Sequence, residues 1–132
     1  MRATTMAMIL TLAAGTALAK PPLRDVAEID DTLLAIGLAD EIRKKCPDIS
    51  GRMVKGFGLI MRLRDRALDL GYTEAEIDSY RKSKSEKARM RARGEAYVKA
   101  RGVNQSKSED WCALGRAEIS RNSQIGALLR LN

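Results

Sequence analysis

The chain has 132 residues, with 24 Lys and Arg, 17 Asp and Glu, a formal net charge of +7 and no histidine. Without histidine, the sequence lacks the usual general base and the commonest metal ligand. Its two cysteines are too few for a structural zinc site, which takes four ligands. We therefore expect no catalytic residue, no metal site and no cofactor.

The first 19 residues have the layout of a secretory signal peptide. Arg2 precedes the apolar run MAMILTLAA, and Ala17-Leu18-Ala19 fits the A-x-A cleavage pattern. The run is shorter than the roughly 20 apolar residues that cross a bilayer. We predict cleavage after Ala19 and a single helical domain over residues 20–132, located in the periplasm. The alternatives are an uncleaved N-terminal anchor and a mobile tail.

Two helices are predicted in the first half of the mature chain, because apolar residues recur at spacings of three and four. The first runs from Arg24 to Cys46, where Pro47 ends it. Its apolar face consists of Val26, Ile29, Leu33, Leu34, Leu38 and Ile42. The second runs from near Ser50 to near Leu70. Its apolar face consists of Met53, Phe57, Ile60, Met61 and Leu68.

A third and a fourth helix follow. Thr73 and Glu76 fit a capping box, which begins a helix that extends to Arg101 with a kink or short break around residues 83–85. Ser108 is predicted as the N-cap of the last helix, which ends near residue 122. Its apolar face includes Cys112, Gly115 and Ile119.

An apolar tail closes the sequence, with Ile125, Leu128 and Leu129 spaced for one or two more helical turns. We expect the tail to fold back on the core. The alternative is that it stays available for a partner.

One disulfide is predicted between Cys46 and Cys112. In an exported chain the two cysteines have only each other, and the bacterial periplasm is oxidising. The bond would tie the end of the first helix to the start of the fourth. The predicted fold class is therefore all-α, a small bundle of about four helices fastened by one disulfide.

The strongest charge signal lies between Arg81 and Arg101, which hold nine basic and two acidic residues. We take as a candidate interaction surface Arg81, Lys82, Lys84, Lys87, Arg89, Arg91 and Arg93. A solvated helix is the alternative. Aromatic residues are too few for a base-stacking platform, so no nucleic acid is expected. The expected partner is a protein or an anionic surface of the cell envelope, and peripheral membrane contact stays open.

We therefore expect a non-catalytic interaction or accessory protein of the periplasm. Two alternatives stay open. The first is a periplasmic chaperone or stress protein, and the second is a small-ligand binder. Neither the specific partner nor the oligomeric state follows from the sequence.

Three stretches of the chain carry a resemblance to a known family. They read LADEIRKKCPDIS (residues 38–50), AEIDSYRKSKSEKARMRARGEAYVKARGV (residues 75–103), and WCALGRAEI followed by SQIGALLR near the C-terminus. The chain resembles the small exported alpha-proteobacterial proteins of domain of unknown function 5333. Where the family has a tyrosine directly before the second cysteine, this chain has Trp111. The resemblance implies a small exported protein, and it supplies no activity, cofactor or catalytic residue.

Overall fold

The computed structural model describes residues 19–132, so the predicted signal peptide lies outside the described residues except for Ala19. In the described part there are five α-helices: α1 (Ala27–Lys45), α2 (Met53–Asp69), α3 (Glu74–Lys82), α4 (Lys84–Ala100) and α5 (Ser108–Ser120). Two short strands, β1 (Ile49–Gly51) and β2 (Leu129–Leu131), form an antiparallel pair. Leu23–Asp25 (η1) and Gly126–Leu128 (η2) are single 3-10 turns. The fold is mostly helical, as predicted.

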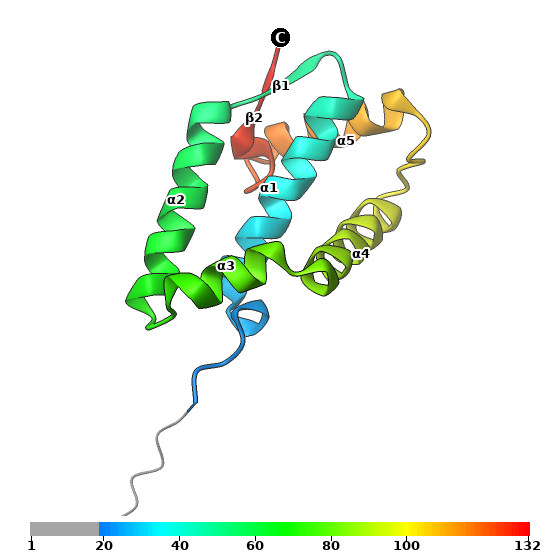
Figure 1. Cartoon of the computed structure of the whole chain (residues 1–132). Helices are drawn as coiled ribbons and strands as arrows, with labels where there is room; N and C mark the ends of the chain where they lie inside the picture. The colour runs from blue at the N-terminus through cyan, green and yellow to red at the C-terminus, as the bar shows by residue number, and fades with distance from the viewer. Residues whose placement is uncertain (1–18) are drawn as a thin grey trace, which may run out of the picture.

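Helix α1 is the central element of the fold (Figure 1). Helix α2 stands at one edge of the molecule and α4 stands at the opposite edge, and α3 connects them across one end of α1. Helix α5 packs on the C-terminal half of α1, and the C-terminal segment returns beside β1. The last residues of the chain thus lie next to the start of α2.

The predicted third helix is two helices, α3 and α4, and Ser83 lies between them. Ser83 has an extended backbone (φ −62°, ψ 121°), and its hydroxyl accepts a hydrogen bond from Glu86 N at 3.2 Å. This serine is therefore the N-cap of α4. The capping box is confirmed at α3, where Thr73 Oγ1 accepts from Glu76 N at 3.1 Å and the Glu76 carboxylate accepts from Thr73 N at 2.6 Å.

The buried side chains form two clusters along α1. The larger cluster surrounds the C-terminal half of α1 and includes side chains from α4, α5 and the tail, among them Ile42, Val98 and Leu129. The smaller cluster lies at the other end, where Ile29 meets Leu63 of α2 with Leu23, Ala67 and Tyr72. Helix α2 thus contributes buried residues mainly from its C-terminal half.

The two-stranded sheet was not predicted. Ile49, Ser50 and Gly51 pair with Leu131, Arg130 and Leu129 respectively. Ser50 therefore belongs to a strand, and α2 begins at Met53 rather than near Ser50. The tail forms one 3-10 turn and a strand instead of the expected helical turns.

The expected N-cap of the last helix is also wrong. Ser108 is already the first residue of α5, and its N-cap is Lys107, which makes no capping hydrogen bond. The Ser108 hydroxyl instead donates to the carbonyl of Lys45 at 2.7 Å. It satisfies one of the free carbonyls at the end of α1 and thereby joins that end to the start of α5.

Candidate functional site

A disulfide joins Cys46, directly after α1, to Cys112 on the first turns of α5. The two Cα atoms are 5.0 Å apart, and both side chains are buried. The predicted pairing is thus confirmed, and it links residues 66 positions apart in the sequence. Structural disulfides of this kind form in oxidising compartments.

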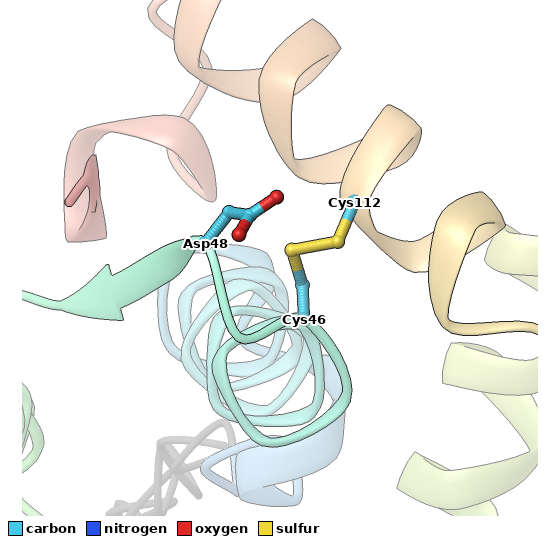
Figure 2. A group of neighbouring side chains, drawn as sticks. All are labelled: Cys46, Asp48 and Cys112. Atoms are coloured by element: carbon cyan, nitrogen blue, oxygen red, sulfur yellow. A yellow bond between two sulfur atoms is a disulfide. The ribbon is translucent and has the colours of Figure 1, made fainter.

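The carboxylate of Asp48 lies beside the disulfide (Figure 2). In the described residues, Cys46, Asp48 and Cys112 are the group whose ligand atoms come within 4.8 Å of one another. The two sulfurs are bonded to each other and supply no thiolate, the form in which cysteine binds metals. Asp48 also forms an ion pair with Arg116 at 3.1 Å. The group is therefore a crosslink with a neighbouring salt bridge, and its donor set does not suit a metal.

Trp111 packs next to the disulfide and is buried. Its indole Nε1 donates to the carbonyl of Gln105 at 3.1 Å, and the Lys45 ammonium lies 5.9 Å from the ring centroid. The tryptophan holds the loop before α5 against the end of α1. Its role is structural packing around the crosslink.

Part of the candidate basic surface is engaged within the protein. Arg89 and Arg93 of α4 form ion pairs with Asp30 of α1, which is only 4% exposed. Tyr80 also donates a hydrogen bond to Asp30 at 2.9 Å. Burial would raise the pKa of Asp30, but the hydrogen bonds from Arg89 and Tyr80 and the arginine charges outweigh it and lower the pKa. Burial and the hydrogen bond to Asp30 raise the pKa of Tyr80 to about 12.

The other members of the candidate basic surface lie at the molecular surface. Arg81 and Lys82 pair with Asp78 on their own helix. Within residues 19–132, no ion pair involves the three remaining cations, Lys84, Lys87 and Arg91. The structure therefore divides the seven residues into a group that holds helices in place and a group that faces solvent.

The apolar tail folds back, because Ile125, Leu128 and Leu129 are all at most 5% exposed. A fully buried carboxylate, that of Glu118 on α5, holds the turn that leads into it. Tyr97 Oη donates to this carboxylate at 2.6 Å, and the Ser123 hydroxyl donates to it as well. The Ser123 hydroxyl in turn accepts from Gly126 N at 3.0 Å.

Glu118 stays charged in this environment. Burial would raise its pKa, but the hydrogen bonds from Ser123 and Tyr97 and the charges of Arg121 and Arg101 lower it. The closest charged partner is Arg121, at 2.5 Å. Each buried polar atom of the network has a hydrogen-bond partner, and the network holds the tail against α5.

An apolar surface lies on α2. It contains four residues of the face predicted from periodicity, which point to solvent instead of the core, and it adds Val54, whereas the predicted Leu68 is only partly exposed. We call this surface the α2 stripe, and it consists of Met53 (62% exposed), Val54 (89%), Phe57 (67%), Ile60 (44%) and Met61 (40%). Leu63 and Ala67, on the neighbouring side of the helix, pack on the core instead. Periodicity identified the apolar face correctly but did not show which side is buried.

Two open grooves flank the α2 stripe where it faces α1. One has a volume of about 360 Å³ and lies between the N-terminal half of α2 and α1 residues 36–43. The other, of about 580 Å³, lies between α2, α3 and the first half of α1. Both are lined mainly by apolar side chains, and Ile60 borders both. Together they extend the apolar surface from α2 toward α1.

A family model described as a family of unknown function (DUF5333) matches residues 21–130. The chain belongs to this family. The matched range contains both cysteines, the α2 stripe and the tail, so all the features above fall within the DUF5333 region. No curated protein and no solved structure matches the chain. Among the helices of residues 19–132, none has both the length and the apolar content needed to cross a bilayer.

Proposed function

We propose that this DUF5333 protein is a non-catalytic interaction or accessory protein of the bacterial cell envelope that works in the periplasm. The observation that carries the proposal is the α2 stripe. Soluble monomers seldom expose contiguous apolar patches larger than a few hundred Å², and larger ones mark contact sites. Here the most clearly amphipathic helix of the fold presents its apolar side outward.

Export is supported by two independent features. The N-terminal sequence has the charged start, apolar run and A-x-A site of a signal peptide. The crosslink between Cys46 and Cys112 is buried in the core, and such bonds persist in the periplasm but are rare in the cytosol.

A chaperone function is the second candidate, and the same stripe favours it. Met53 and Met61 flank Phe57, and methionine side chains adapt to varied apolar partners. A chaperone would suppress the aggregation of many unrelated unfolded proteins. An accessory protein would bind one component of the envelope and leave such aggregation unchanged.

The proposal is tested by fractionation of cells that express the full chain. We expect a mature protein that begins at Lys20, as judged by intact mass, in the periplasmic fraction and in complex with an envelope component. The double variant Val54→Ser/Phe57→Ser should lose that component. Both side chains are exposed, so the change should alter the free energy of unfolding by no more than about 0.5 kcal/mol.

Two matched variants separate the surfaces. Ala113→Ser/Ala117→Ser changes two exposed positions on α5, far from α2, and should behave as the wild type. Lys84→Gln/Lys87→Gln tests the solvent-facing cations of α4. A protein that stays in the cytoplasm, or a complex that none of the variants weakens, would contradict the proposal.

A further inference from the structure

We propose that the α2 stripe docks on an anionic phospholipid surface, with α2 lying in the plane of the headgroups. This inference rests on the proposed envelope location and names the partner of the contact surface. Helix α2 is amphipathic along its length. Its apolar side chains occupy one side, and Lys55, Arg62 and Arg66 occupy the side opposite. Helices with this distribution lie at membrane interfaces, with the apolar side buried in the headgroup and acyl boundary.

The stripe is large enough for such a contact. The exposed fractions of the five residues add up to about three whole apolar side chains, which is enough apolar surface for a functional contact patch. Val54 and Phe57 are the most exposed of the five residues, at 89% and 67%. Both belong to α2, which lies at one edge of the molecule (Figure 1). A protruding row of side chains on an edge helix suits a flat surface better than it suits a concave one.

The charge around the stripe is positive. From Ile49 to Arg64 the chain contains no acidic residue and four basic ones, Arg52, Lys55, Arg62 and Arg64. The acidic residues that line the two grooves, Asp40, Glu74 and Asp78, are all held in ion pairs. Their partners are Arg43, Lys44, Arg64, Arg81 and Lys82. Arg64 also pairs with Asp65, so with Arg52 included six cations stand against four carboxylates around the stripe.

This charge balance decides between the possible occupants. In a symmetric dimer, a second copy would place an identical positive rim against the first, and like charges across an interface cost binding free energy. An anionic lipid surface instead neutralises the rim. Each Lys or Arg close to such a surface raises the affinity by about fivefold at low salt. The observations therefore favour the lipid surface over self-association.

The test is vesicle flotation of the mature, oxidised protein. The two probes are vesicles of phosphatidylcholine alone and vesicles of equal parts phosphatidylcholine and phosphatidylglycerol. With a net excess of two charges, we expect the anionic vesicles to bind roughly 25-fold more tightly at low salt, with the difference shrinking as salt is added.

Two variants separate the apolar and the electrostatic parts. Val54→Ser/Phe57→Ser should weaken binding to the anionic vesicles by at least about tenfold, because two large apolar contacts are removed. Arg81→Gln/Lys82→Gln removes two exposed cations of the rim and should weaken binding at low salt and reduce its salt dependence. Ala113→Ser/Ala117→Ser on α5 is the control and should bind as the wild type. Circular dichroism and thermal melting establish that every variant is folded.

Three results would overturn the inference. The first is no binding to anionic vesicles, and the second is binding that the stripe variant leaves unchanged. The third is a wild-type dimer in analytical ultracentrifugation that the stripe variant dissociates, since it would identify a second copy as the occupant. If the protein does not bind anionic vesicles but its complex with one envelope protein still depends on Val54 and Phe57, the lipid inference is wrong and the proposed function stands.

Discussion

Opening the disulfide between Cys46 and Cys112 should destabilise the protein strongly without removing any packed atoms. The bond closes a loop between residues 66 positions apart, and the chain-entropy relation for such a loop gives about 4 kcal/mol at 25 °C. Both sulfurs lie in the core, where reduced thiols still pack as small apolar groups. For a folded region of this size, the loss corresponds to a drop in Tm of about 15–20 °C.

The measurement is urea and thermal unfolding of the oxidised protein and of the protein in excess reductant, with a thiol assay to establish the redox state. Cys46→Ala/Cys112→Ala provides the control, because it should melt near the reduced wild type and be insensitive to reductant. If a protein with two titratable thiols has the same Tm as the oxidised form, the crosslink does not limit the unfolded state and our reasoning is wrong.

Three further predictions concern the tail and the buried carboxylates. Leu129→Ala should lower the free energy of unfolding, measured in urea, by about 2–5 kcal/mol, because the side chain is 1% exposed. A loss under 1 kcal/mol would mean that the tail does not belong to the hydrophobic core. Gly126→Ala should lower the free energy of unfolding more than Gly115→Ala does. The Cβ added at position 126 would meet backbone, with Ile119 N at 2.6 Å, whereas the Cβ added at position 115 would meet isoleucine side chains that can shift. Equal losses of stability in the two variants would contradict this explanation. Asp30 and Glu118 have lowered pKa values in the folded protein, so each carboxylate stabilises the fold while it is charged. This contribution to the free energy of unfolding is fully present above their ordinary pKa values of 3.8 and 4.5. It is lost as the pH falls through their folded-state pKa values. Urea midpoints at neutral and acidic pH measure the loss, and Glu118→Gln should make it smaller.

Features that depend on local sequence were predictable. The capping box at Thr73, the break near Ser83 and the end of α2 near Leu70, after which Gly71 adopts a φ of 89°, all follow from a few neighbouring residues. The pairing of Cys46 with Cys112 followed from number and compartment alone. The helix signals have physical causes that act within one or two helical turns. The disulfide was predictable because each cysteine has only one possible partner.

Features that depend on distant residues were not predictable. The strands are three residues long, too short for an alternating pattern, and Ile49 pairs with a residue 82 positions later. The contacts of Arg89 and Arg93 with Asp30 likewise join residues far apart, so a run of cations that looks like a binding surface in the sequence partly holds α4 against α1. Charge alone does not distinguish these two roles.

The orientation of α2 illustrates a different limit. Periodicity locates the apolar side of a helix, and the usual inference is that this side is buried. In α2 the core instead uses Leu63 and Ala67, which lie about a quarter to a third of a turn from the centre of the stripe. An amphipathic pattern is therefore evidence for an apolar contact, whereas the identity of that contact has to come from the packing of the rest of the fold.

The return of the tail to β1 also constrains when the protein can fold. A chain that has emerged from the ribosome or a translocation channel only as far as α5 lacks three side chains of the larger core cluster and the partner strand of β1. Contacts between residues so distant in sequence form late, because the intervening loop must close first. The segment before α2 would stay unpaired during that interval, so the two-stranded sheet and the tail complete the fold last.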